Sequence, residues 1–303
     1  GGDGDGAQNA PEGFDPGYWI GATDIDTWTG RSNTNWATAG NWSSGVIPAT
    51  GDKVFIHDAA NDPDISTDIT LTGLTVKANG VLDIEATGSL TLSGNYSNSG
   101  TVNLNSSSSR YSSLIIQGTS SGNITYHRYV NSVSNGSGWD LIGSPVGGLS
   151  INSFATTNDT PLATGGGSGS NQYAIGTFDN SQSSTSAAWE NYTSDGAGST
   201  TNISAAGNFT KGKGYQMATD SGATLAFTGT VDTDATETIS IESFTDASGR
   251  RWNLISNPYP SYITIGPNTT TDTFLEVNDD IIDATYVGVY GYDANTDNDG
   301  LTE

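Results

Sequence analysis

The sequence predicts an all-β protein, in which a short right-handed β-helix or solenoid leads into tandem, jelly-roll-like β-sandwich modules, the second one incomplete. Three observations favour this fold class. Glycine accounts for 40 of the 303 residues, while 7 Trp, 13 Tyr and 8 Phe supply large apolar surfaces for a core. Short alternating stretches recur evenly between residues 65 and 126. A Trp-x-Leu-Ile phrase occurs twice, as "WDLIGSPV" and "WNLISNPYP".

The first part of the chain divides into a leader and a cap. Residues 1–25 are rich in Gly, Asp and Pro, and we expect a flexible leader or linker. The chain starts without Met, which suggests a processed or excised piece of a longer protein. Trp28, Trp36 and Trp42 fall within fifteen residues. We favour a cap of rings over the open end of a β stack, and a sugar-stacking platform is the alternative.

A solenoid is expected to complete the segment 26–130. The stretches "LTGLTV", "GVLDIE", "GSLTLSGN" and "GTVNLNSS" each combine a short alternating strand with a Gly or Asn turn, enough for about three or four coils. Alternation places six side chains inside: Leu74, Val76, Leu82, Ile84, Leu90 and Leu92. Four asparagines suit the corners, where Asn tolerates left-handed backbone: Asn95, Asn98, Asn103 and Asn105.

An internal repeat defines the remainder. Trp139 and Trp252 are 113 residues apart, and so are Pro145 and Pro258. The spacing predicts a first β-sandwich module over 131–248 and a second, truncated module over 249–303, with a strand near Tyr286. Each Trp-x-Leu-Ile strand is expected to bury its Trp, and the following Pro should end the strand because it lacks a ladder donor.

These phrases resemble a known group. "WTGRSNTNWATAGNWSSGVIPATGDKVFI", "WDLIGSPV", "FTKGKGYQM" and "WNLISNPYPSYI", in this order, are similar to modules of large secreted surface proteins of Bacteroidetes that carry a type IX secretion sorting domain. The resemblance covers roughly residues 26–303 and implies extracellular or cell-surface display. It implies no catalytic residues, and the sorting domain itself is absent from this sequence.

Charge narrows the classes of partner. The formal net charge is −24, from 33 acidic and 9 basic residues, so nucleic acid and anionic membrane surfaces are repelled. The absence of Cys excludes disulfides and thiolate zinc sites, and no run of about 18 apolar residues would span a membrane. Hard carboxylate oxygens suit calcium.

Calcium is the predicted ligand. Oxygen-bearing side chains alternate in a loop that ends in Gly300, which resembles half of a calcium-binding loop: Asp293, Asn295, Asp297 and Asp299. A flexible hairpin loop is the alternative. Two weaker candidates are the segments 278–283 and 58–64.

Catalysis is not expected. His57 and His127 are the two histidines, and no spacing links either to a nucleophile. The sequence therefore predicts a non-catalytic structural or adhesive surface protein, stabilised by calcium, whose partner is itself, in extracellular fibres, or a surface glycan. The alternative is a carbohydrate-binding ancillary region of a larger secreted hydrolase.

Overall fold

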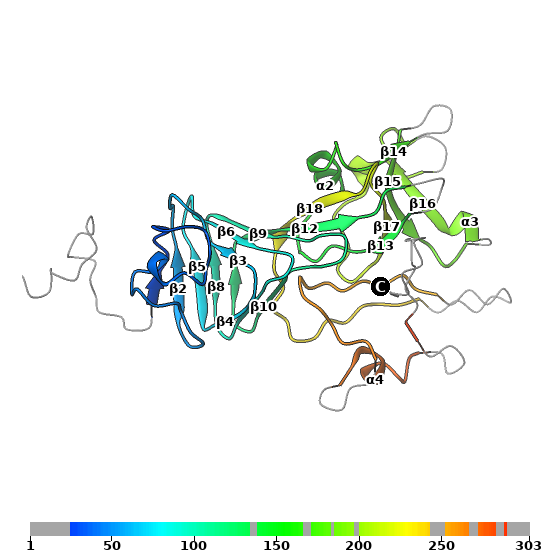
Figure 1. Ribbon diagram of the computed structural model, residues 1–303. Coiled ribbons are helices and arrows are strands. Elements are labelled where there is room, and N and C mark those ends of the chain that lie inside the picture. Colours follow the sequence, from blue (N-terminus) through cyan, green and yellow to red (C-terminus); the bar gives the residue numbers. More distant parts are fainter. Residues whose placement is uncertain are drawn as a thin grey trace, which may run out of the picture.

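The structure is a computed structural model that describes residues 25–133, 138–165, 171–182, 185–196, 200–242, 252–266, 272–282 and 288–289. It is elongated, with a stack of short strands at one end and an antiparallel sheet with the few helices at the other (Figure 1). The predicted fold class is confirmed, because a β-solenoid of about three turns over residues 53–126 leads into an antiparallel sheet.

Three parallel sheets form the walls of the solenoid. The first contains β1 (Ile25–Thr27), β2 (Lys53–Ile56), β5 (Gly73–Val76), β8 (Tyr96–Asn98) and β11 (Ser120–Ser121). The second contains β4 (Asp68–Leu71), β7 (Ser89–Leu92) and β10 (Ser113–Ile116). The third begins with β3 (Asp64–Ile65), β6 (Val81–Ile84) and β9 (Thr101–Leu104).

The coils stack in register with their aliphatic side chains inside. Val54 pairs with Leu74, and Leu74 pairs with Tyr96, so successive coils are about 20 residues apart. All six side chains that the alternation places inside are at most 2 % exposed, which confirms that prediction. Each such burial contributes about 1.5–3 kcal/mol, so the interior is a packed core.

One of the four asparagines expected at corners lies inside a strand instead. Asn103 is in β9, where its Nδ2 donates to Asp83 Oδ1 at 2.7 Å, whereas Asn98 ends β8 and its Oδ1 accepts from the N–H of Gly100 in the bend that follows, at 2.8 Å. The corner prediction is wrong for Asn103, because its amide bonds along the stack. Asn79, with φ 64°, is the one described non-glycine residue with positive φ.

One sheet joins the solenoid to the second half of the molecule. β12 (Asn123–Val130) runs parallel to β9 and pairs antiparallel with β18 (Ala223–Thr230) along eight residues. The same sheet thus passes from solenoid to module (Figure 1), and one hydrophobic core extends from Trp28 to Val231.

The module itself is an antiparallel sheet with short helices. Its strands are β13 (Asp140–Ile142), β17 (Tyr215–Met217), β15 (Gln172–Phe178), β14 (Thr164–Gly165) and β16 (Trp189–Thr193), which pairs with β15. The helical segments are α2 (Ile151–Thr157), α3 (Thr185–Ala188) and η3 (Ile203–Ala205), and η2 (Ala39–Asn41) lies near the N-terminal end. Phe154 of α2 packs against Phe227 of β18, with ring centroids 4.5 Å apart.

The second copy of the repeat lies against the first. The N–H of Gly214 donates to the carbonyl of Leu254, and the N–H of Ser256 donates to the carbonyl of Gly212. Trp252 is 47 % exposed, so the prediction that this phrase buries its Trp is wrong for the second copy. The helix α4 (Phe274–Val277) follows. The expected strand near Tyr286 lies outside the described residues.

Candidate functional site

The three predicted carbohydrate-binding tryptophans form a closed cluster. Trp28, Trp36 and Trp42 are 0, 2 and 3 % exposed. Trp42 meets the other two edge-on, with centroid distances of 4.6 Å to Trp36 and 5.0 Å to Trp28. The rings occupy one another's faces, so the arrangement leaves no open ring face on which a sugar would stack. This geometry favours the cap interpretation.

The segment 58–64, a weaker calcium candidate, helps to hold this cap. The carbonyl of Asn61 accepts from Trp28 Nε1 at 2.7 Å, and Asn61 Nδ2 donates to the carbonyl of Gly30 at 2.7 Å. Gly30 has φ 58°, and a Cβ there would lie 2.3 Å from the Asn61 carbonyl oxygen, so the close approach requires glycine. The side-chain amide of Asn61 therefore helps to hold the cap together.

The predicted calcium loop, Asp293, Asn295, Asp297 and Asp299, lies outside the described residues. In the other weak candidate, 278–283, Asp279 and Asp280 are exposed in a turn after α4. Asp283 is also outside the described residues.

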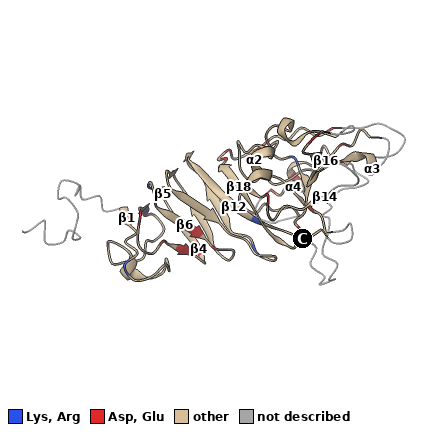
Figure 2. Cartoon of the chain, turned by 90° about the horizontal axis from the view of Figure 1, so that it is seen from above, with Lys and Arg blue, Asp and Glu red and all other residues tan. Residues whose placement is uncertain are grey.

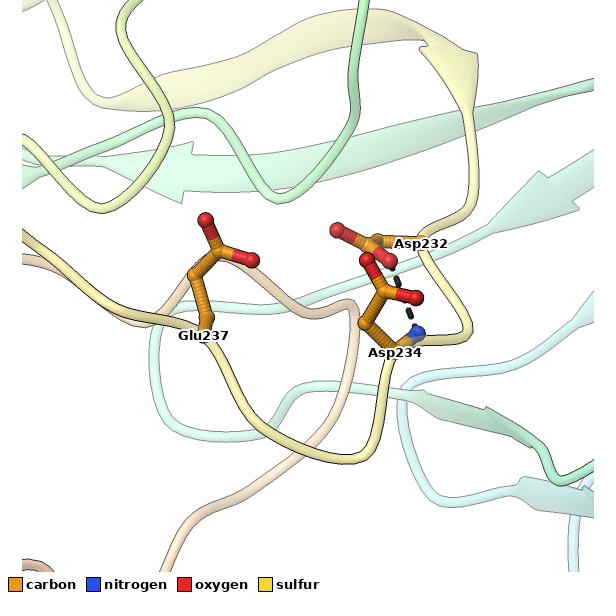
Figure 3. A group of neighbouring side chains, drawn as sticks. All are labelled: Asp232, Asp234 and Glu237. Atoms are coloured by element: carbon orange, nitrogen blue, oxygen red, sulfur yellow. Dashed lines mark hydrogen bonds between the residues drawn. The ribbon is translucent and has the colours of Figure 1, made fainter.

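The structure brings together an acidic cluster that the sequence reading missed. Asp232, Asp234 and Glu237 lie on the loop that follows β18, and carboxylate oxygens of the three lie within 4.8 Å of one another (Figure 3). The Asp234 N–H donates to Asp232 Oδ1 at 2.8 Å. The available signal was the spacing in "VDTDATE", where two acids alternate directly after a strand.

A lysine already neutralises part of this cluster. Lys211 Nζ forms ion pairs with Asp232 and with Glu237, the latter at 2.5 Å. Three carboxylates and one ammonium group leave two net negative charges. Oxygen ligands of this kind suit calcium, and an incoming cation would compete with Lys211 for two of the three carboxylates.

A cavity adjoins the acidic cluster where the solenoid, the first module and the second copy meet. Its volume is about 260 Å³. The lining combines β11, the end of β18 and the "NPYP" phrase: Ser120, Val146, Gly147, Lys211, Thr230, Val231, Asp232, Thr233 and Pro258. The charged members, Lys211 and Asp232, pair with each other, so the lining presents no free carboxylate dyad.

The "NPYP" phrase fastens this junction. The Tyr259 hydroxyl donates to the Asp234 carbonyl at 2.9 Å, and the Leu114 N–H donates to the Pro260 carbonyl at 2.8 Å. The Tyr262 hydroxyl donates to the carbonyl of Tyr111 at 2.8 Å. Leu114 belongs to β10, the edge strand of its sheet, so the phrase covers an open edge at the end of the solenoid.

A second acidic group lies on the outer face of the third sheet. Asp64 and Asp83 occupy paired positions on β3 and β6, and Figure 2 shows an acidic residue in red on β6. Burial raises the pKa of Asp62 above its ordinary value, and Asp83 raises it further. Burial also raises the pKa of Glu85, although a hydrogen bond from Asn105 opposes the shift.

The two histidines lie in different surroundings. Burial lowers the pKa of His127, and Asp83 partly opposes the shift. His57 Nδ1 lies 2.8 Å from the carbonyl oxygen of Asp58. In the described part of the chain, neither ring hydrogen-bonds to a carboxylate or to a nucleophilic hydroxyl.

These features define a class of protein in which a capped β-solenoid is joined through one sheet to an antiparallel β module. A family model described as a domain of unknown function, DUF8693, matches residues 27–300, and the chain belongs to this family. The comparisons with curated proteins and with solved structures gave no match. None of the described helices has the length and apolar character needed to cross a membrane.

Proposed function

We propose that this protein is a non-catalytic structural or adhesive element displayed outside the cell, which acts as a stiff spacer. The single observation that supports this proposal is the continuous hydrophobic core, which extends from the Trp cap through the solenoid into the module. A shared core resists bending between the two parts, because bending would expose apolar surface to water. Stiffness and length are the properties that a surface spacer requires.

The packing also favours a non-catalytic role. Aliphatic side chains fill the solenoid, and the charged side chains of the cavity at its end form an ion pair. Catalytic sites place convergent acid, base or nucleophilic groups in a pocket. The proposed location outside the cell rests on the resemblance to type IX-secreted surface proteins of Bacteroidetes.

Calcium and self-assembly complete the proposal. A chain of net charge −24 repels its own copies, and divalent cations would reduce that repulsion. We place calcium at the loop of Asp293, Asn295, Asp297 and Asp299, with the cluster around Asp234 as a weaker second position. With calcium bound, neighbouring copies would associate into extracellular fibres.

Negative-stain electron microscopy with calcium and with chelator, combined with small-angle X-ray scattering, tests the proposal. We expect rods of constant length. Fibres that dissolve in chelator would support calcium-dependent assembly, whereas single rods under both conditions would support an unassembled adhesive spacer. Scattering from two parts that tumble independently would contradict the proposal, because a shared core does not allow such motion.

A further inference from the structure

The cavity beside the acidic loop lies where the solenoid stack ends. In the first sheet, Val54, Leu74 and Tyr96 occupy paired positions that form one inward-facing column, and they are 0, 2 and 1 % exposed. Ser120 of β11 takes the next position in this column, and it lines the cavity of about 260 Å³. A hydroxyl therefore replaces the apolar side chains at the point where the stack opens into a cavity.

Two further hydroxyls line the same cavity. Thr230 ends β18, and Thr233 lies on the loop that follows. Within the part of the chain that the structure describes, the side-chain hydroxyls of Ser120, Thr230 and Thr233 have no hydrogen-bond partner. Each can therefore both donate to and accept from a molecule bound in the cavity.

The walls that carry these hydroxyls are held in place by hydrogen bonds. The N–H of Gly147 donates to the carbonyl of Thr230 at 2.8 Å, and the N–H of Thr230 donates to the carbonyl of Gly147 at 3.1 Å. Pro258 of the second copy also lines the cavity, and the hydroxyl of the adjacent Tyr259 donates to the carbonyl of Asp234 at 2.9 Å. Walls that are fixed before a ligand arrives lower the entropic cost of binding.

Apolar side chains supply another part of the lining. Val146 and Val231 are each 6 % exposed, and Pro258 is buried beside them. A pyranose ring carries hydroxyls at its rim and C–H groups on its faces, so it matches both kinds of surface in this cavity. The cavity is smaller than the range of about 300–1,000 Å³ that is typical of drug-sized ligands, which favours a single ring over a longer chain.

Charge selects the kind of sugar. Lys211 and Asp232 line the cavity and form an ion pair, so the lining itself carries no net charge. Asp234 and Glu237 lie on the same loop as Asp232 (Figure 3), and their carboxylates would repel an acidic sugar. We propose that this cavity binds one neutral sugar residue at the end of a surface glycan. The inference rests on the adhesive role proposed above and gives that role a binding site.

Saturation-transfer difference NMR on the full chain tests the proposal. The neutral probes are the methyl glycosides of glucose, galactose, mannose and N-acetylglucosamine, each measured in chelator. The matched acidic probes are methyl glucuronide and methyl galacturonide. We expect saturable transfer to at least one neutral probe, and roughly tenfold weaker binding of the acidic probes.

Variants of the lining locate the site. Thr230→Val and Thr233→Val each remove one hydroxyl at nearly constant volume, and the double variant should bind roughly tenfold more weakly. Thr233→Phe places a ring in the cavity and should abolish the saturation transfer. Thr224→Val changes an exposed threonine of β18 outside the cavity, so it should leave the affinity unchanged. Thermal melts show whether each variant folds.

Three outcomes would overturn the proposal. Absence of saturation transfer to every neutral probe would show that the cavity holds water alone. Binding that survives both the double variant and Thr233→Phe would place the sugar elsewhere. Binding that occurs only with added calcium would place the sugar on a metal ion at the acidic cluster. Scattering measures the stiff spacer without any sugar, so failure of the sugar site is distinguishable from failure of the spacer role.

Discussion

At the scale of single residues, Lys211 holds the acidic loop after β18 in place. Its ammonium group contacts Asp232 and Glu237, and Tyr259 of the second copy bonds to the same loop at Asp234. Without the lysine, three carboxylates would face one another unneutralised. The carboxylates would then repel one another and displace the loop. The hydrogen bond between Tyr259 and the loop would weaken as a result.

Lys211→Met tests this role. We expect the free energy of unfolding in chelator to fall by about 1–2 kcal/mol, because two partly buried carboxylates lose their partner. Millimolar calcium should restore part of the loss in the variant, since the cation would replace the ammonium group. Chemical denaturation with and without calcium measures both effects, with Lys53→Met as a control on an exposed strand position. An unchanged free energy in chelator would contradict the role.

Asp62 and Glu85 are expected to give stability an unusual dependence on pH. Both pKa values are raised in the folded state, so the folded protein binds more protons than the unfolded chain between the ordinary and the raised values. These two groups therefore cost stability at neutral pH. That cost diminishes as the pH falls through their folded pKa values.

The double variant Asp62→Asn, Glu85→Gln should be more stable than the wild type at pH 7, with the difference in Tm shrinking toward pH 4. Asp179 supplies a control of opposite sign, because hydrogen bonds from Ser181 and Gln182 lower its pKa. Asp179→Asn should lose stability at pH 7, and that loss should diminish as the pH falls. Thermal melts between pH 4 and pH 7 measure the effects of the double variant and of Asp179→Asn. If the Tm difference between the double variant and the wild type did not depend on pH, the raised pKa values of Asp62 and Glu85 would be contradicted.

At the scale of elements, the second copy depends on close backbone approach to the first. A Cβ at Gly214 would lie 2.6 Å from Leu254 Cγ, so Gly214→Ala should push this strand-like segment away. We expect faster hydrogen exchange over 252–262 while the solenoid keeps its protection.

Gly165→Ala is the matched control, because no described atom lies within 4 Å of a Cβ placed there. It should leave exchange in the second copy unchanged. Unchanged hydrogen exchange over 252–262 in Gly214→Ala would contradict this prediction. It would show that the contact between Gly214 and Leu254 does not hold the segment in place.

At the scale of the whole molecule, the shared core predicts that solenoid and first module unfold together. Phe227 lies in β18 at the junction and is fully buried, so Phe227→Ala should cost about 3–5 kcal/mol. Hydrogen exchange of the variant and of the wild type, measured at increasing denaturant, gives the stability of each strand. The loss caused by Phe227→Ala should be the same at β7 in the solenoid and at β15 in the module. A loss confined to the module would show two independent units.

The solenoid could be predicted from the sequence because its signal is local. Which face of a short strand is buried depends on alternation, and alternation is readable residue by residue, as the burial of Leu82 and Ile84 confirms. The repeat was readable for a similar reason. Trp139 and Trp252 are separated by the same 113 residues as Pro145 and Pro258, and this equality can be detected without a structure. The exposure of Trp252 was not predictable, because burial depends on what lies opposite.

The sequence by itself thus determined the β class and the stacked coils, because these follow from composition, alternation and spacing. Only the tertiary structure decided that Lys211 meets Asp232 and Glu237, and that Pro260 closes the edge of β10. These partners are far apart in the sequence, and alternation says which side chains turn inward without saying which segments meet. Such long-range contacts are specified by the packing of the whole chain.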